Sequence, residues 1–386
     1  MKTNNQPSSI IHHPLKANIN APLRAVGLMS GTSLDGIDAA IITTDGETIT
    51  EFGEFVTIPY TEEFKARLRK ALAEGRNWKP GTNEEILSDK ELEHDLTVLH
   101  AEAVKKLVAK TGIKPDIIGF HGQTIIHKPH DGFTWQMADG ELLAQLTGID
   151  IVSDFRMADV RAGGQGAPLV PVFHKAITEG LPKPIAIVNI GGVANITWIS
   201  EGAATGSNLL AFDTGPGNAM INDIMRQHFN LDYDDGGAVA ARGNVDEDVL
   251  AEYLTDDYFK KKPPKSLDRN HFTLEHVKDL KPEDAVATLT AFTALSIMMS
   301  NSYFDKPVPK FYITGGGRHN KRIMQTLGDR AEPIEVIGHN GDAFEAQAFA
   351  YLAVRVKYGL PITFPSTTGC KASPVKNIAR ISHVKC

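Results

Sequence analysis

The sequence predicts an α/β protein built from two related domains with a cleft between them. The chain has 386 residues, and single hydrophobic cores stop growing at roughly 250–300 residues. Each half begins with antiparallel strands around a glycine-rich turn and then alternates helices with strands. Hydrophobic residues make up 42% of the chain and charged residues 23%, which is the composition of an ordinary folded protein.

The first half opens as a strand meander, because short apolar runs are separated by a glycine-rich turn and by Asp45-Gly46, a hairpin signal. The later helix patterns stop at Gly112 and Gly148, as helices commonly do at glycine. In chain order, the expected elements are strands 24–29, 37–43 and 47–58, helices 61–74 and 83–111, strand 116–120, a turn at 121–124, helix 141–147 and strand 149–154.

The second half repeats this arrangement with apolar strands that end in glycine-rich turns. The expected elements are strands 185–189, 195–199 and 209–212, helices 219–229 and 282–303, strand 310–314 and helix 342–358. For the domains, we expect a disordered tail at 1–22, a first domain of 23–162 completed by a returning segment 359–386, and a second domain of 163–358.

Four glycine-rich turns follow predicted strands, and together they indicate a shared phosphate-binding cleft. Glycine lets backbone amides approach phosphate oxygens without a Cβ in the way, although a tight turn alone also explains glycine. No Gly-x-x-x-x-Gly-Lys-Ser/Thr pattern occurs, so this is not a P-loop protein. The expected ATP-binding residues are Gly31, Thr32, Ser33, Leu34, Asp35, Gly36, Ile37, Asp38, Gly191, Gly192, Asn195, Gly215, Gly217, Asn218, Gly315, Gly316 and Gly317.

Charge and hydropathy argue against nucleic-acid and membrane partners. The net charge is −7, and the one dense basic run, residues 260–262, reads as a solvated loop. The N-terminus is polar, unlike a secretory signal, and the sequence shows no run of about 18 apolar residues for a membrane span. The two cysteines, Cys370 and Cys386, fit neither a zinc motif nor a disulfide framework. We therefore expect a cytoplasmic protein.

Several sequence blocks resemble the anhydro-N-acetylmuramic acid kinase family, and they occur in the same order from about residue 27 to residue 350. Residues 29–38 read MSGTSLDGID, 119–124 read GFHGQT, and 154–156 read DFR. Further matches are GGQGAPL at 163–169, NIGGVAN at 189–195 and FDTGPGN at 212–218. One departure is Arg161, where the family pattern suggests a small residue; it adds a charge beside the expected sugar loop.

The resemblance implies the actin-like ATPase fold, in which two related ribonuclease-H-like domains enclose an ATP cleft. It also implies a kinase that opens the 1,6-anhydro bridge of anhydro-N-acetylmuramic acid with water while phosphorylating O6. The product would be N-acetylmuramic acid 6-phosphate, formed in peptidoglycan recycling and amino-sugar catabolism. ATP and Mg²⁺ are the implied cofactors, and a homodimer is expected.

Asp213 is the expected general base, because it follows a strand at a glycine turn where a carboxylate can reach water, as in inverting glycoside hydrolysis. The alternative for Asp213 is a helix cap. Asp35 and Asp38 are candidates to hold Mg²⁺ through water, and a local turn bond is an equal alternative for Asp35. The expected substrate-binding residues are Ser33, His121, Arg156 and Gln165, with Arg156 suited to a lactyl carboxylate. The resemblance alone adds Glu345, since a single acid on a helix is ordinarily part of a solvated face.

Two other functions remain open at this stage. A kinase for another 1,6-anhydro sugar, such as levoglucosan, would have no lactyl group for Arg156 to bind. An actin-like ATPase that acts on no sugar would hydrolyse ATP independently of one. A metal site made of His121, His127 and His130 is disfavoured, because no further ligand stands at a recognisable spacing.

Overall fold

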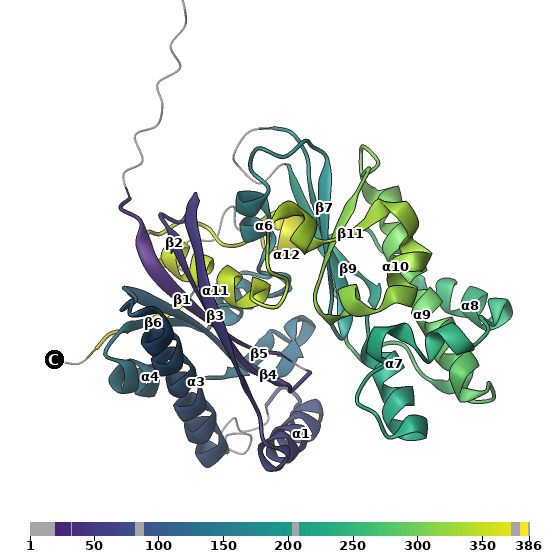
Figure 1. The fold of residues 1–386 in the computed structure, drawn as a ribbon, viewed down its shortest axis with the longest axis horizontal. Helices are drawn as coiled ribbons and strands as arrows, with labels where there is room; N and C mark the ends of the chain where they lie inside the picture. The colour runs from purple at the N-terminus through teal and green to yellow at the C-terminus, as the bar shows by residue number, and fades with distance from the viewer. Residues whose placement is uncertain (1–19, 32, 82–88, 203–207, 372–378, 385–386) are drawn as a thin grey trace, which may run out of the picture.

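Two mixed β-sheets, one in each half of the chain, form the centre of the molecule (Figure 1). The computed structural model describes residues 20–31, 33–81, 89–202, 208–371 and 379–384. The main strands of the first sheet are β1 (Leu23–Ser30), β2 (Gly36–Thr44), β3 (Ile49–Pro59), β4 (Ile117–Lys128) and β6 (Asp150–Ser153). Those of the second are β7 (Ile185–Ile190), β8 (Val193–Ile199), β9 (Leu209–Pro216), β10 (Phe311–Thr314) and β11 (Ala331–Pro333).

The two sheets have the same topology. The strand order is β3-β2-β1-β4-β6 in the first and β9-β8-β7-β10-β11 in the second. In each sheet the first three strands form an antiparallel meander, and the last two join it in parallel. Parallel pairs need crossover connections, which is why helices separate these strands. The predicted fold class, two related α/β domains of the ribonuclease-H-like type, is confirmed.

The helices of the first half begin and end at residues that suit those positions. Side chains of Thr61, Asp89 and Asp139 accept hydrogen bonds from the first-turn amides, and Gly112 and Gly148 end two of the helices in the left-handed conformation. These helices are α1 (Glu62–Arg76), α3 (Lys90–Thr111) and α4 (Gly140–Thr147). Two shorter helices, α5 (Met157–Arg161) and α6 (Pro171–Ile177), begin without a side-chain cap. Helix 83–111 is thus confirmed from residue 90; residues 82–88 lie outside the described part of the chain.

The second sheet is flanked by α9 (Pro282–Met299), which has twelve buried residues and no clear polar face. Together with the turn that follows, Pro282–Tyr303 is apolar and long enough to cross a membrane, but 72% of its apolar window is buried inside the protein. The segment therefore passes for a membrane span by length and composition only, and in the structure it is mostly buried, as a core helix is. Its neighbours are α7 (Ala219–Ile224), α8 (Glu247–Leu254) and α10 (Lys321–Leu327).

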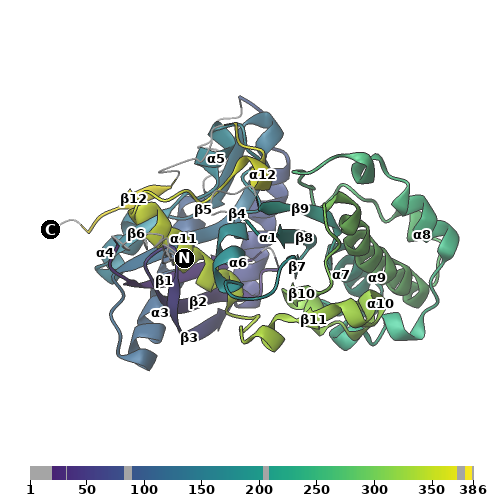
Figure 2. The same ribbon diagram turned by 90° about the horizontal axis from the view of Figure 1, so that it is seen from above.

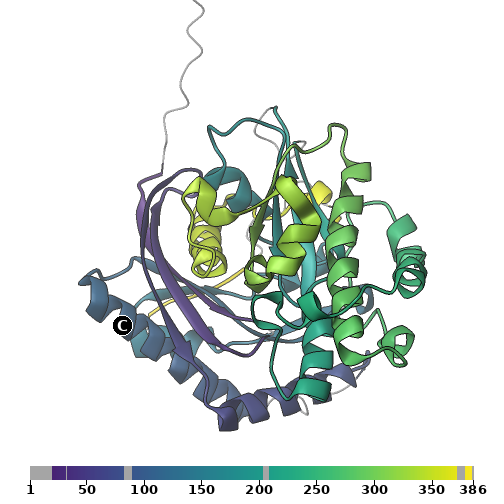
Figure 3. The same ribbon diagram turned by 45° about the vertical axis from the view of Figure 1, so that its right-hand side comes forward.

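Helix α11 (Phe344–Lys357) packs against the first sheet although it follows the second along the chain. Gly27 and Gly119, paired in register on β1 and β4, let the helix approach very closely: a Cβ on Gly119 would lie 2.1 Å from the carbonyl oxygen of Phe349. Figures 2 and 3 show α11 beside the purple strands. We therefore propose placing the domain boundary before α11 and not at residue 358, so that the helix belongs with the sheet it covers.

Two local predictions need correction. Residues 121–124 do not form a turn, because β4 continues through them with a bulge; Gly122 takes φ +72° there and the pairing with β1 shifts. The helix expected to start at 342 begins at Phe344. The elements not predicted are short: β5 (Phe133–Met137), β12 (Arg380–Ser382), α5, α6, α8, α10, β11 and α12 (Pro365–Thr368). The tail expected at 1–22 lies mostly outside the described residues.

Candidate active site

A row of polar side chains crosses the second sheet where its strands end. Asp213 on β9 is in register with Asn195 on β8, Asn195 with Asn189 on β7, and Asn189 with Thr314 on β10. Residues in register on neighbouring strands lie on the same face of a sheet. Among the described residues, the buried Oδ1 of Asn195 and Oγ1 of Thr314 have no hydrogen-bond partner. Buried polar atoms are normally paired, so this row has the character of a ligand-binding surface.

Asp213 is buried, with 8% of its surface exposed, and one of its carboxylate oxygens accepts a hydrogen bond of 2.8 Å from the backbone N–H of Leu267. Burial raises its pKa to about 7, against the lowering effects of the Leu267 N–H, Arg156 and Lys265. The helix-cap alternative is wrong, because α7 starts six residues later and its N-cap is Asn218. A carboxylate with a pKa near neutrality suits a general base.

Arg156 lies between the two halves of the site. Its Nε donates to Nε2 of His121 (3.0 Å) and its Nη1 donates to the Gly166 carbonyl oxygen (2.9 Å). Burial lowers its pKa to about 10, while Glu345 and Asp213 act to raise it. The guanidinium is still charged at neutral pH, so one half-buried cation interacts in charge with Asp213 on β9 and Glu345 on α11.

His121 is buried and is fixed by two partners. Its Nδ1 donates to the Gly122 carbonyl oxygen (2.7 Å), and its Nε2 accepts from Arg156; this pattern requires the neutral tautomer protonated at Nδ1. Burial, followed by the charge of Arg156, holds its pKa well below the usual value. Because both ring nitrogens are engaged, His121 is placed to hold Arg156 and not to contact a sugar directly.

Glu345 starts the first turn of α11, and its Oε1 accepts a hydrogen bond from Nδ2 of Asn189 (3.3 Å). Burial raises its pKa, Arg156 lowers it, and the nearby charge of Asp38 raises it further. The structure thus brings Glu345, Arg156 and Asp213 into one electrostatic unit, although they lie 57 or more residues apart in the chain. Gln165 joins this group through Ser266, whose hydroxyl donates to its Oε1 (2.7 Å) next to the segment that holds Asp213.

The glycine turns of the second half contact one another. The N–H of Gly217 donates to the Gly192 carbonyl oxygen and that of Asn218 to the Gly191 carbonyl oxygen. A Cβ on Gly317 would lie 2.3 Å from the Ile190 side chain, whereas nothing lies within 4 Å of the Cβ position of Gly316. The turns therefore form one surface, in which some glycines allow close backbone packing and Gly316 borders open space.

A family model for anhydro-N-acetylmuramic acid kinase matches residues 23–377. This chain belongs to the anhydro-N-acetylmuramic acid kinase family. Relatives of that name from Rhodospirillum rubrum (48% identical, 89% of this chain and 91% of the relative) and Paramagnetospirillum magneticum (47%, 90% and 97%) are similar over nearly their whole lengths. A glucokinase of the ROK family from Streptomyces griseus, solved with glucose and AMPPNP, is 11% identical with a TM-score of 0.37 over 86% of this chain and 98% of its own.

In this kinase family member, two of the side chains of the first glycine-rich turn and its flanks, residues 31–37, are buried in the core and so cannot reach a ligand. Leu34 and Ile37 are buried in the core of the first half, and a Cβ on Gly36 would lie 2.2 Å from the Ile58 carbonyl oxygen. Leu34 takes a left-handed φ of +60° and closes the turn with a bond to Gly31. Ser33 and Asp35 are exposed, so these two side chains are open to a ligand. Thr32 lies outside the described residues.

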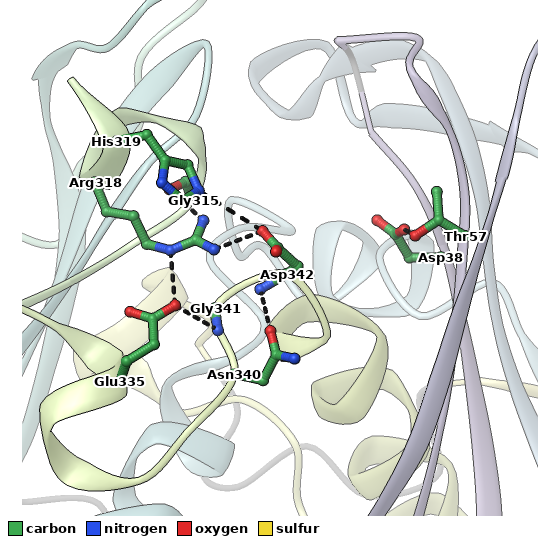
Figure 4. A network of polar contacts seen from close by, with 9 residues as sticks. All are labelled: Asp38, Thr57, Gly315, Arg318, His319, Glu335, Asn340, Gly341 and Asp342. Atoms are coloured by element: carbon green, nitrogen blue, oxygen red, sulfur yellow. Dashed lines mark hydrogen bonds and ion pairs between the residues drawn. The ribbon is translucent and has the colours of Figure 1, made fainter. Parts of the chain in front are cut away.

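Acidic side chains from both halves face the space between the domains (Figure 4). Burial raises the pKa of Asp38, whose Oδ1 accepts from the Thr57 hydroxyl (2.6 Å), and the charges of Asp342 and Asp35 raise it further. Among the described residues, no group of three or more His, Cys, Asp or Glu side chains is placed to hold a metal ion. Asp35 and Asp38 still fit Mg²⁺, which takes one or two carboxylates and fills its other positions with water and substrate phosphates.

Sequence reasoning missed Arg318, Asp159 and Lys265. Arg318, with 4% of its side chain exposed, donates to Glu335 (3.0 Å), to Asp342 (2.5 Å) and to the Gly315 carbonyl oxygen (3.0 Å), as Figure 4 shows. Asp159 accepts from the Gly166 N–H (2.7 Å) and so shapes the loop around Arg156. A single charged residue gives no periodic signal, so only its place directly after the Gly315–Gly317 turn singles out Arg318.

Arg161 does not lie in this site. It lines a separate cavity of about 460 Å³ with Trp135, Asp154 and Arg380, and its positive charge opposes the rise that burial causes in the pKa of Asp154. The expectation that Arg161 adds a charge beside the sugar loop is therefore wrong in its location.

Proposed function

We propose that this protein is an ATP-dependent kinase that opens 1,6-anhydro-N-acetylmuramic acid with water and phosphorylates O6, giving N-acetylmuramic acid 6-phosphate for cell-wall recycling. Membership of the anhydro-N-acetylmuramic acid kinase family supports the substrate and the reaction class. The observation that carries the mechanism is Asp213: a buried carboxylate with a pKa of about 7, in register with the unpartnered Asn195 and coupled in charge to Arg156.

Asp213 takes a proton from the water that attacks the anomeric carbon. The bond between the anomeric carbon and O6 breaks, O6 attacks the γ-phosphorus of ATP, and ADP leaves. Because phosphoryl transfer depends mainly on positioning and on charge stabilisation, the glycine turns hold the phosphates through their amides. Asp35 and Asp38 would hold Mg²⁺ through water, and the bound ion would supply charge neutralisation to the phosphates.

The sugar lies between Asp213 on one side and Arg156 and Glu345 on the other. The guanidinium of Arg156 suits the lactyl carboxylate, and its bonds to the described residues use Nε and Nη1. His121 and Asp159 support this side of the site: His121 bonds to Arg156, and Asp159 bonds to the Gly166 N–H, whose carbonyl oxygen accepts from Arg156. Gln165 and Ser33 complete the proposed contacts, through an amide and a hydroxyl that suit sugar hydroxyl groups.

The substitution Asp213→Asn tests the proposal in ¹⁸O-labelled water. The parent protein should place one ¹⁸O in the anomeric hydroxyl of a 6-phosphate, as mass spectrometry of the product will show. The variant should lose turnover by roughly 10²- to 10⁴-fold, which is the contribution of a general base, and keep its far-ultraviolet circular dichroism. Near-normal turnover in a correctly folded variant, or a product without label, would refute the proposed role.

Arg156→Ala separates this function from the levoglucosan alternative. Loss of the guanidinium should lower kcat/KM for the muramic substrate by roughly 10- to 100-fold, about the value of a charge-assisted hydrogen bond to a carboxylate. It should change kcat/KM for a 1,6-anhydro sugar without a lactyl group much less. An equal loss on both sugars would indicate that Arg156 serves the site through His121 and Gly166 and not through the carboxylate.

Cytoplasmic location, the homodimer, the Mg²⁺ requirement and the absence of membrane or nucleic-acid partners remain proposals as well. The proposed substrate is a small anionic sugar and the net charge of the protein is −7, so local groups must attract the sugar, not the overall charge. Light scattering after size exclusion measures the oligomeric state, and activity after chelation, restored by added Mg²⁺, measures the metal requirement.

A further inference from the structure

A buried lysine, Lys265, lies on the segment that is hydrogen-bonded to the backbone of Asp213. Lys265 is only 7% exposed. Its Nζ lies 4.3 Å from the ring centre of Tyr258, 4.8 Å from that of Tyr303, and 5.9 Å from those of Phe212 and Phe259. We call these four rings the aromatic box. An ammonium ion over aromatic faces is attracted by their electron density, and more strongly when water is excluded.

Polar contacts hold the ammonium group inside the aromatic box. Nζ of Lys265 donates to the Tyr258 carbonyl oxygen (3.0 Å) and to the Tyr303 hydroxyl (3.2 Å). The Tyr303 hydroxyl in turn donates to the Phe259 carbonyl oxygen. The salt bridges recorded among the described residues include none of Lys265, so its charge is not cancelled by a directly paired carboxylate.

Three hydrogen bonds hold Asp213, two of them with residues 265–267 and one with Tyr258. The backbone N–H of Asp213 donates to the Lys265 carbonyl oxygen (3.0 Å), and the Tyr258 hydroxyl donates to the Asp213 carbonyl oxygen (2.5 Å). Two residues beyond Lys265, the Leu267 N–H donates to the Asp213 carboxylate (2.8 Å). Anchoring the Lys265 side chain therefore fixes the backbone that orients the proposed base.

We propose that Lys265 is a positioning residue for Asp213: held in the aromatic box, it orients the 265–267 segment and supplies the positive charge that keeps the Asp213 carboxylate ionised. This role rests on the proposed function of Asp213 as the base. It differs from the role of Arg156, which approaches Asp213 from the other domain and is also coupled to Glu345.

The charges around the pair support this role. Asp213 is influenced by Arg156 and Lys265, and its own charge raises the pKa of Tyr258, for which burial is the larger cause. Burial lowers the pKa of Lys265 to about 8, Lys261 lowers it further, and Asp213 raises it. At neutral pH the ammonium form therefore still predominates, and the positive charge behind Asp213 is present where the base must act.

Lys265→Met tests the proposal because it keeps the length of the side chain and removes its charge. Without the ammonium ion the pKa of Asp213 rises, so the acidic limb of the pH profile of kcat/KM should move upward by about 1 pH unit. On the acidic side of the limb this is a roughly tenfold lower kcat/KM. Lys265→Arg keeps the charge and should leave the limb near its original position.

Lys261→Met is the matched control, since Lys261 is exposed and also lies near the Tyr258 ring, at 5.9 Å. The acidic limb of the kcat/KM profile of this control variant should not move.

If Lys265→Met does not fold, Lys265→Gln removes the same charge and retains a donor for the Tyr258 carbonyl oxygen. A folded neutral variant whose limb stays in place overturns the inference, and so does an equal shift in Lys265→Arg. If Asp213→Asn keeps normal turnover, the proposed function itself has failed; if only the Lys265 variants behave as the parent protein does, this inference alone has failed.

Discussion

Asp213, the proposed base, illustrates how a group suited to catalysis opposes the stability of the fold. Its pKa in the folded protein is about 7, well above the 3.8 of an unperturbed aspartate. Because the carboxyl pKa is raised in the folded state, the contribution of Asp213 to the free energy of unfolding is most favourable below the unfolded pKa. This contribution is lost as the pH rises through the folded pKa. At pH 7 the buried carboxyl group is therefore about half ionised, and its ionised form lowers the stability of the fold, which is a common cost of a functional site.

Asp213→Asn should consequently stabilise the protein, and more so at high pH. The melting temperature of the variant should exceed that of the parent by a growing margin between pH 4 and pH 7, and the margin should be constant above that range. The free-energy margin grows at up to about 1.4 kcal/mol per pH unit within this window. Thermal unfolding at several pH values measures it; a margin that does not change with pH would show that Asp213 is not held at a raised pKa.

At the scale of elements, the glycines show what sequence reasoning can and cannot resolve. Four turns, at 31–36, 191–192, 213–218 and 315–317, were predicted to share one phosphate-binding cleft. The second and third contact each other through hydrogen bonds, and the fourth lies against Ile190, next to the second; the shared phosphate site stays a prediction. The sequence did not distinguish glycines that border open space from those that admit a neighbouring backbone. Gly36 and Gly317 are of the second kind: Gly36 admits the neighbouring strand β3 at Ile58, and Gly317 admits Ile190 of β7, which is distant along the chain.

Gly119→Ala should disturb the site through α11. The new Cβ would lie 2.1 Å from the Phe349 carbonyl oxygen, which the helix can relieve only by moving away from the sheet. Overpacking of this kind typically costs about 1–3 kcal/mol of stability, occasionally more. Because Glu345 is on the same helix, KM for the sugar should rise more than KM for ATP; chemical denaturation and steady-state kinetics measure the two effects.

Gly316→Ala is the matched control for Gly119→Ala. Nothing lies within 4 Å of its Cβ position, so the free energy of unfolding should stay within about 0.5 kcal/mol of the parent value, as for other exposed substitutions. If the turn holds the nucleotide, KM for ATP should rise while KM for the sugar changes little. The opposite pattern, with the sugar affected, would separate this turn from the nucleotide.

At the scale of the whole molecule, the duplicated topology was predictable because hairpin turns and alternating strands are local signals. The return of α11 to the first sheet was not, because the helix is buried on nearly every side and its sequence does not indicate which sheet it covers. The same holds for the association of Asp213, Arg156 and Glu345. The roles of Asp213 and Arg156 were predicted from residue chemistry together with the resemblance, and that of Glu345 from the resemblance alone, whereas their electrostatic coupling is a property of the folded chain.

Domain closure is the last prediction, and it follows from the acidic groups that face one another across the cleft. Asp38 on β2 and Asp342 before α11 are close enough for the charge of Asp342 to raise the pKa of Asp38 (Figure 4). Closure brings these like charges nearer and is opposed by them. In small-angle scattering, the radius of gyration should therefore fall when a non-hydrolysable ATP analogue and the sugar are added with Mg²⁺, and fall less without Mg²⁺.

Asp38→Asn tests the electrostatic part of this prediction. The asparagine keeps an acceptor for the Thr57 hydroxyl, which bonds to Oδ1 in the parent protein, and removes one of the two facing charges. When both ligands are added without Mg²⁺, the variant should close further than the parent protein does, because one of the two facing charges is gone. If the radius of gyration of the parent is the same with and without ligands, the two domains do not close; if both proteins close equally far without Mg²⁺, repulsion between Asp38 and Asp342 does not control the motion.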